Sequence, residues 1–415
     1  MFYLQCASIY LVLMLNLSAA AAIMNEIIIN NRFGENIPEP TYQAARIASP
    51  AIAHHFEQHF SAARQNGILH LAPEPSANII ERIIDVAFWA SLGREEGHSP
   101  KISLAFLPPE MAGTPMVFEH HLPFQTNTLT KLAPAVERPG IHLGVWLHDG
   151  ELFLWGTTRE ITGLCFVLEV VEPGLLVVKH RRIDGMGKFV NVATLKGDQI
   201  KLVDEQSRNT ADRPPIISSL LGFTSSYTDS DSVNVLVQLA ASMRAHGRGG
   251  ALLVVPADTD EWKDSIIHPI TYPVLSAFSG LSDLMNLNDQ EENRMLWHSL
   301  LRQAVDSVGG LTAVDGATII NERHELLAFG AKIGRSWKSK RVDQIVITEP
   351  IIGSAASVVH PATLGGTRHL SAAQFVFDQR DAVALVASQD GRFTIFAWSP
   401  REEMVHAHQI DILLL

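Results

Sequence analysis

Two polar, glycine-containing segments in the second half of the chain constrain the fold most, because each adjoins a run that predicts regular structure. The first is Asp315-Gly316-Ala317, which leads into the apolar residues of a predicted strand. The second is Gly365-Gly366-Thr367-Arg368-His369, which is followed by the small residues of a predicted helix start. Backbone N–H groups at a helix start bind anions, arginine matches phosphate oxygens with a planar fork, and glycines allow close approach. The pattern predicts a phosphate-binding turn in an α/β fold.

Composition limits the classes of function. The chain has 415 residues, enough for two or three domains, and 47% of them are hydrophobic, so most of the chain can bury a core. The formal net charge of −12 argues against a general binder of nucleic acid or anionic membranes, and we expect no DNA or RNA partner. The two cysteines, Cys6 and Cys165, form no zinc-type spacing, which fits a reducing compartment.

Residues 1–23 are interpreted either as a signal-like segment or as a mis-assigned N-terminal extension. An apolar run, Ile9 to Leu15, and the small residues Ala19 to Ala22 are typical of a signal. No lysine or arginine precedes Arg32, and the apolar run is short for a membrane span. Met24 would begin a cytosolic chain. We expect a cytoplasmic protein, and an exported or membrane-anchored one if the signal is real.

Residues 24–205 predict an N-terminal domain that is helical at first and then rich in strands. Helical periodicity covers 40–67, and Ser76 is a candidate N-cap for a second helix. His55 and His59 share a face of the first helix, which would suit a metal. A solvated or core-lining pair is the favoured interpretation, because no third ligand lies at helical spacing.

Short apolar runs separated by turn residues predict strands over 102–203. Asp149-Gly150 predicts a hairpin, across which Trp146 and Trp155 are expected to pair as core or, alternatively, to line a ligand groove. The basic run 179–182 is interpreted as a solvated turn, with a phosphate contact as the alternative.

A polar segment over 206–230 predicts a linker between this domain and a second one, residues 231–403. The second domain begins with a helix that ends at Gly247, followed by a buried strand over 249–256. A long helical insert is expected over about 275–308, before the strand that follows Asp315. Residues 404–415 are expected to form a terminal strand or tail. This is an α/β layer pattern.

Over about 231–399 the sequence resembles the diadenylate cyclase domain of the DisA/DacA type, which joins two ATP molecules into cyclic di-AMP. Asp315-Gly316-Ala317 matches the DGA motif of that family, and Gly366-Thr367-Arg368-His369 with Ala372-Ala373 matches its GTRHRAA motif. Asp381-Ala382 with Ser388 and Gly391 resembles its closing segment. The resemblance implies a mixed sheet flanked by helices, preceded here by the α+β, strand-rich N-terminal region.

The resemblance also implies the roles of individual residues. Asp315 would lie at the ribose 3′-OH and at a Mn²⁺ or Mg²⁺ ion, and would be the catalytic residue of an active enzyme. Thr367, Arg368 and His369 would contact the triphosphate. A homo-oligomer formed through this domain would bring two nucleotides together. The predicted nucleotide-binding residues are Asp315, Gly316, Ala317, Gly366, Thr367, Arg368, His369 and Ser371, where Ser371 could instead be an N-cap.

The sequence departs from the cyclases at three positions. Leu370-Ser371 stands where the family has a second arginine, Gln389-Asp390 replaces an acidic pair, and Val314 replaces a histidine. Loss of these groups should reduce catalysis more than binding, because they act on charge that develops during transfer. Gly365 to Gln374 resembles more closely the DACNV subgroup of probable nucleotide sensors. That resemblance extends to Gly144-Val145-Trp146 and 187–193.

Three hypotheses follow from the sequence. The first is a sensor that binds an adenine nucleotide or a cyclic dinucleotide. The second is an active diadenylate cyclase, and the third is a scaffold without a ligand.

Overall fold

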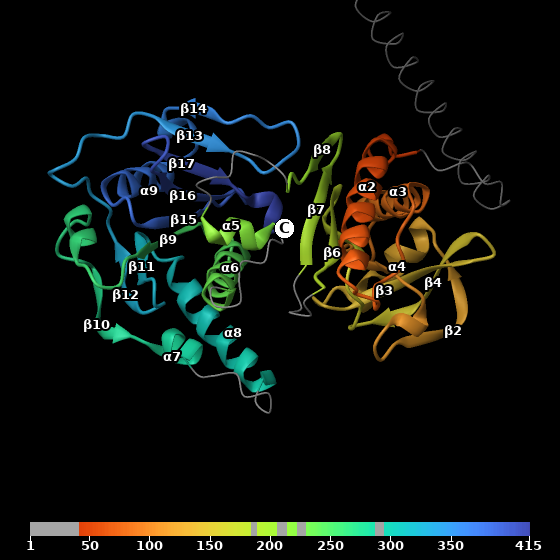
Figure 1. Ribbon diagram of the computed structural model, residues 1–415. Coiled ribbons are helices and arrows are strands. Elements are labelled where there is room, and N and C mark those ends of the chain that lie inside the picture. Colours follow the sequence, from red (N-terminus) through yellow and green to blue (C-terminus); the bar gives the residue numbers. More distant parts are fainter. Residues whose placement is uncertain (1–40, 184–188, 206–213, 222–229, 287–293) are drawn as a thin grey trace, which may run out of the picture. The chain divides into compact units, whose positions relative to one another are not determined.

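Two mixed β-sheets, each covered by helices, make up the part of the chain that the computed structural model describes (Figure 1). This part comprises residues 41–183, 189–205, 214–221, 230–286 and 294–415. The chain divides into Met1–Tyr42 and Gln43–Leu415, and the segment interpreted as a signal lies outside the described residues. Among the helices described, none combines the length and the apolar character needed to cross a bilayer. The predicted α/β fold class is confirmed.

The N-terminal sheet has the order β2-β4-β3-β1-β5-β6-β7-β8, and its only parallel pair is β1 with β3 among the strands described. Its strands are β1 Ile102–Phe106, β2 Met116–Pro123, β3 His142–His148, β4 Glu151–Thr158, β5 Phe166–Glu172, β6 Leu175–Arg181, β7 Phe189–Lys196 and β8 Gln199–Leu202. Three helices accompany it: α2 Gln43–Gln65, α3 Ala77–Leu92 and α4 Thr126–Val136. Ser76 caps α3 as predicted, since its Oγ accepts from the Ile79 N–H at 3.4 Å.

The predicted hairpin at Asp149-Gly150 joins β3 to β4, and both residues have the positive φ that its turn requires. The expected pairing of the two tryptophans is wrong. Trp146 lies opposite Phe153, because the two-residue turn pairs His148 with Glu151 and fixes the register that follows. The Trp155 ring instead covers Gly144, and its Nε1–H donates to the Leu107 carbonyl at 2.8 Å.

The basic run 179–182 was expected in a solvated turn, and this is also wrong for most of it. Lys179, His180 and Arg181 belong to β6. Lys179 is buried, and its Nζ lies 2.6 Å from Glu169 Oε2 on the neighbouring strand. The pairing lets a cation enter the sheet, because the charge is compensated where it is desolvated.

The C-terminal sheet has the order β10-β12-β11-β9-β15-β16-β17-β13-β14. Its strands are β9 Gly250–Val255, β10 Tyr272–Phe278, β11 Ala317–Asn321, β12 Leu326–Ala331, β13 Ile345–Thr348, β14 Ser357–Val359, β15 Val383–Ala387, β16 Phe393–Ser399 and β17 Met404–Gln409. The helices are α5 Pro215–Leu220, α6 Ser230–Ala245, α7 Gly280–Asn286, α8 Arg294–Leu311 and α9 Thr367–Asp378.

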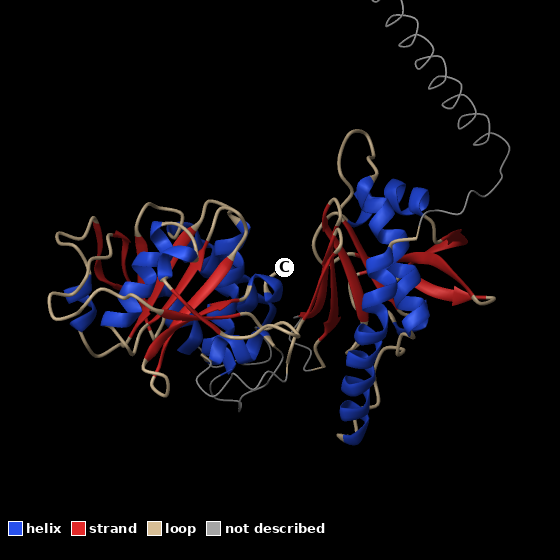
Figure 2. Ribbon diagram, turned by 90° about the horizontal axis from the view of Figure 1, so that it is seen from above, coloured by secondary structure: helices blue, strands red, loops and turns tan. Residues whose placement is uncertain are grey.

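The helices of this domain lie on both faces of the sheet (Figure 2). The strand β9 shows why, since its side chains alternate between two cores. Leu252 and Val254 pack with residues of α6 and α8, whereas Leu253 and Val255 pack with residues of α9. The central strands are therefore apolar on both sides, as expected for a buried strand.

Two sequence-based boundaries need correction. The helical insert expected from residue 275 starts instead with a strand, because Tyr272 and Pro273 pair with β12, and the helices α7 and α8 follow. The strand expected at 404–415 forms as β17, but it pairs with both β16 and β13 and so belongs to the C-terminal sheet. In the predicted linker, 206–230, most residues lie outside the described ranges, and α5 occupies 215–220.

The contact between Trp155 and Gly144 yields a stability prediction. A Cβ at position 144 would stand 2.0 Å from the indole ring, which its hydrogen bond to Leu107 holds in place. Gly144→Ala should therefore lower the free energy of unfolding by about 1–3 kcal/mol. Chemical denaturation measures this loss.

The matched control is Gly310→Ala in α8, where an added Cβ meets no atom within 4 Å. It should be neutral or slightly stabilising, because alanine is the better helix former. Equal effects of the two substitutions would contradict the proposed role of the indole.

Candidate functional site

The register of the C-terminal sheet brings the predicted motifs to one edge of that sheet. Ala317, at the start of β11, is the parallel partner of Ala251 in β9 and pairs with Ala331 at the end of β12. Gly250, at the start of β9, pairs with Ala387 at the end of β15. The Asp-Gly-Ala motif and the closing segment 388–392 therefore leave the sheet at the same edge.

Asp315 stands in solvent at this edge. Its side chain is 87% exposed, and its Oδ2 accepts a hydrogen bond from Lys332 Nζ at 2.5 Å. This hydrogen bond and the charge of Lys332 lower the pKa of the Asp315 carboxyl, and the charge of Arg368 lowers it further. Asp315 is thus ionised at neutral pH and lies within electrostatic range of the arginine that the sequence paired with it.

Glycine is required at position 316, where the Asp-Gly-Ala motif passes close to the backbone of Gly330 in β12. Gly316 has φ +119°, and a Cβ there would stand 2.4 Å from the carbonyl carbon of Gly330. Gly330 in turn lies against the ring of Tyr272, which stacks on Phe329 at 4.8 Å with an interplanar angle of 14°. Tyr272 is 47% exposed, so an aromatic surface open to solvent flanks the motif.

The start of α9 supplies the cationic part of the site. The N-cap, Gly366, forms no side-chain cap, so the first N–H groups of the helix are not used by a capping side chain. Arg368 extends toward β9: its Nη1 lies 3.1 Å from the position that a Cβ of Gly249 would take. Within the described residues its guanidinium forms no ion pair. Thr367 is exposed at the first helical position.

His369 is placed differently from the expectation that it contacts phosphate. The residue is buried, its Nε2 lies 3.4 Å from Thr394 Oγ1, and its ring meets Phe396 edge-on. Burial lowers the pKa of His369, which favours the neutral ring. We therefore assign His369 a structural role, since its buried ring packs beside Gly365 in the Gly365-Gly366 turn that precedes α9.

Two further sequence-predicted residues have clear positions. Ser371 is not the N-cap of α9, because Gly366 is, and it lies one turn after Thr367 on the same helix face. Ala317 is buried within β11, so only its backbone is available to a ligand.

Sequence reasoning missed several residues of this edge. Lys332, Tyr272 and Gly249 come from separate segments and carry no motif. The pairing of β12 with β10 and β11 brings Lys332 and Tyr272 here, and the pairing of β9 with β11 and β15 brings Gly249. The turn 388–392 closes with a hydrogen bond from Ser388 N–H to the Arg392 carbonyl at 2.9 Å. Its charged residues, Asp390 and Arg392, form an ion pair of 3.3 Å.

The expected Mn²⁺ or Mg²⁺ ion fits this arrangement poorly. These ions take oxygen ligands in well-defined geometry, with one or two carboxylates in addition to phosphate. Here one oxygen of Asp315 already binds Lys332, and Asp390 is paired with Arg392. The described residues include no group of three potential metal ligands that contains Asp315. At the Asp315 carboxylate, the ammonium group of Lys332 supplies the positive charge that a metal ion would otherwise bring.

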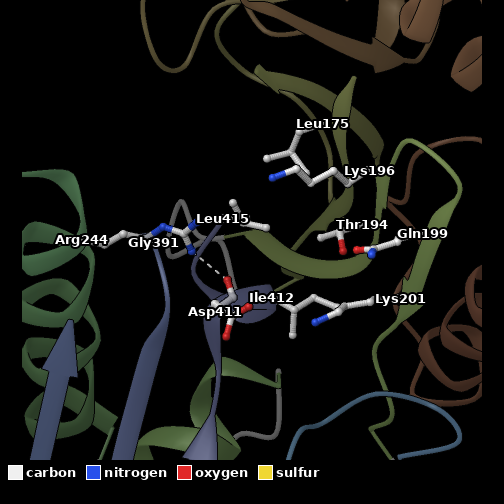
Figure 3. Close-up of a pocket in the computed structure, with 10 residues that line it drawn as sticks. All are labelled: Leu175, Thr194, Lys196, Gln199, Lys201, Arg244, Gly391, Asp411, Ile412 and Leu415. Carbon is white, nitrogen blue, oxygen red and sulfur yellow. Dashed lines mark hydrogen bonds between the residues drawn. The ribbon is translucent and has the colours of Figure 1, made fainter. Parts of the chain in front are cut away.

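A hollow of about 160 Å³ lies where β6, β7 and β8 meet the C-terminal end of the chain (Figure 3). Arg244 of α6 points into this region and donates to the Asp411 carbonyl at 2.8 Å (Figure 3). The hollow is also lined by Lys196 and Lys201, and by Gly391 of the turn 388–392. The same turn therefore borders both the sheet-edge site and the contact with the N-terminal sheet.

Comparison with known families places the sensor resemblance in the N-terminal sheet. Residues 69–159 match the family model of DACNV, described as a probable sensor domain. No curated protein matches the chain. The matched segment includes Gly144-Val145-Trp146 and ends at β4, before the C-terminal sheet begins. The match supports a sensor role for the protein.

The geometry at Asp315 yields a titration prediction. Because Lys332 lowers the pKa of this exposed carboxyl, Lys332→Ala should raise the pKa of Asp315 toward the value of a free aspartate. The ¹³C shift of its carboxyl carbon, followed by NMR as a function of pH, measures this change.

Lys338→Ala is the matched control, since Lys338 forms a similar exposed ion pair with Asp264. It should leave the titration of Asp315 unchanged. An unaltered Asp315 pKa in Lys332→Ala would show that the ion pair does not form in solution.

Proposed function

We propose that the protein is a sensor whose C-terminal domain binds an adenine nucleotide or cyclic dinucleotide at the sheet edge beside Asp315. The observation that carries this proposal is the meeting of one acid, one arginine that forms no ion pair within the described residues and an open helix start at the same edge. The match of residues 69–159 to a probable sensor domain supports the regulatory part.

The phosphates would bind at the start of α9. Helix N-terminal N–H groups and the helix dipole favour an anion, and a guanidinium adds two parallel hydrogen bonds to phosphate oxygens. Arg368 rests against Gly249, where a larger side chain would displace the guanidinium. Thr367 and Ser371 lie on one helix face and offer hydroxyl groups to the same anion.

The nucleoside would bind on the other side of Asp315. A flat base stacks well on an aromatic ring, and Tyr272 presents a half-exposed ring next to the Asp315-Gly316 turn. An ionised carboxylate accepts hydrogen bonds from ribose hydroxyl groups, and Asp315 is ionised. A ligand with a base, a ribose and a phosphate matches the three parts of this edge.

Several features favour a sensor over a cyclase. Transfer of a nucleotidyl group requires positioned cations and a metal to neutralise developing charge. Two carboxylates are already in ion pairs, Asp315 with Lys332 and Asp390 with Arg392. In addition, Leu370 stands where the cyclases carry a second arginine. These changes remove groups that act in the transition state and keep those that bind phosphate. Oligomerisation through this domain is not required for a sensor.

Ligand binding tests the proposal directly. ATP, cyclic di-AMP and related nucleotides would be screened by thermal denaturation, because a ligand that binds only the folded state raises its stability. We expect at least one of them to raise the melting temperature. Arg368→Ala should weaken that ligand at least about tenfold, which corresponds to roughly 1.4 kcal/mol for a charged hydrogen bond.

Arg323→Ala is the matched control. Arg323 is exposed and lies just after β11, at the opposite edge of the same sheet, where it pairs with Asp258. Its substitution should leave binding unchanged. The absence of a shift with every nucleotide, or equal effects of the two arginine substitutions, would contradict the proposed site.

Incubation with labelled ATP and Mn²⁺ or Mg²⁺ separates the sensor from the enzyme. We expect no cyclic di-AMP to form. Robust product that disappears in Asp315→Asn would replace the sensor with an active diadenylate cyclase.

A further inference from the structure

Three histidines and a glutamate meet inside the N-terminal domain, far in sequence from the motifs of the sheet-edge site. His55 and His59 lie one turn apart on α2, His180 lies on β6, and Glu205 follows β8. One ligand atom from each of the four lies within 4.8 Å of the others. The sequence offered only the pair on α2, because the third and fourth groups come from other elements that the fold brings to this face.

We propose that His55, His59, His180 and Glu205 form a binding site for a divalent transition-metal ion of the Zn²⁺ type. Three imidazoles and one carboxylate are a ligand set that Zn²⁺ accepts in tetrahedral geometry, whereas Mg²⁺ and Ca²⁺ prefer oxygen ligands.

Unpartnered polar atoms carry this proposal. His55 Nε2, His180 Nε2 and Glu205 Oε1 are buried and have no hydrogen-bond partner among the described residues. Buried polar atoms without partners are rare and costly in native proteins. A single metal ion would satisfy the cluster, since each residue offers it one atom.

The protonation states suit a metal. Burial lowers the pKa of His55 to about 2, and the neighbouring rings of His59 and His180 lower it further. Burial likewise lowers the pKa of His180 to about 4. Both rings are neutral at physiological pH, and the neutral imidazole is the form that binds a metal.

The geometry of the rings is close to that of a bound state. His55 and His59 have ring centroids 4.3 Å apart, and each lies within 5.5 Å of the His180 ring. His180 Nδ1 lies 3.2 Å from the Arg181 carbonyl, an arrangement that fixes the ring and leaves Nε2 for the ion. Ligand atoms of a tetrahedral zinc site are roughly 3.3 Å apart, so small side-chain rotations would close the cluster.

The position of Glu205 links this site to the C-terminal domain. Two residues earlier, Val203 forms a β-bridge with Ile351, and the Asp204 N–H donates to the Pro350 carbonyl at 2.9 Å. A bound ion would therefore hold α2 and β6 to the segment through which the N-terminal sheet contacts the other domain.

Cobalt substitution tests the site whichever transition metal binds there in the cell. The full chain is stripped of metal with a chelator and titrated with Co²⁺, whose four-coordinate complexes absorb visible light much more strongly than the hydrated ion. We expect one equivalent of Co²⁺ to give intense visible bands that Zn²⁺ abolishes and excess Mg²⁺ does not. A wild-type titration without such bands would overturn the proposal, whatever the variants do.

Substitutions assign the ligands. Glu205→Gln and His59→Ala affect the more accessible members of the cluster, and each should weaken Co²⁺ binding at least about tenfold. The matched control is His54→Ala on the same helix, because His54 is exposed and contacts only Glu57 and Gln58 through its ring nitrogens among the described residues. Circular dichroism checks that the variants fold. Bands of equal strength in His54→Ala and in the two ligand variants would overturn the assignment.

Discussion

The pairing of β9 with β11 on one side and with β15 on the other is the constraint on which the candidate site depends. One partner is parallel and the other antiparallel, so the start of β11 and the end of β15 reach the same edge of the sheet. The helix α9 packs across one face of these strands and starts beside that edge, where Arg368 meets Gly249. A slip of one residue would reverse the two faces of β9 and separate the acid from the arginine.

The side chains at this edge bear on whether the site is suited to ligand binding or to catalysis. Asp315 is ionised and held by Lys332, while Arg368 forms no ion pair within the described residues and lies next to an uncapped helix start. His369 stabilises the turn from inside. In the function we propose, such an arrangement would bind an anion in its ground state and offer little extra stabilisation to a transition state. The turn that contains Gly391 also borders the hollow lined by residues of β6, β7 and β8, which belong to the same sheet as the strands of the matched segment 69–159.

The sequence predicted elements with strong local signals and missed what long-range pairing decides. The hairpin at Asp149-Gly150 and the N-cap Ser76 follow from turn and capping chemistry that acts over a few residues. The tryptophan pairing was wrong because the two-residue turn pairs His148 with Glu151, which sets Trp146 opposite Phe153. Lys332 could not be assigned from any local pattern, since its contact with Asp315 depends on the pairing of β11 with β12.

The central claim is that a nucleotide's phosphates bind at the start of α9. A crystal structure of the protein with ATP or a cyclic dinucleotide tests it most directly. We predict phosphate oxygens within hydrogen-bonding distance of Arg368 and of the first N–H groups of α9, with the base on Tyr272. Phosphates found instead in the hollow lined by Lys196 and Arg244, or no bound nucleotide at saturating concentration, would contradict it.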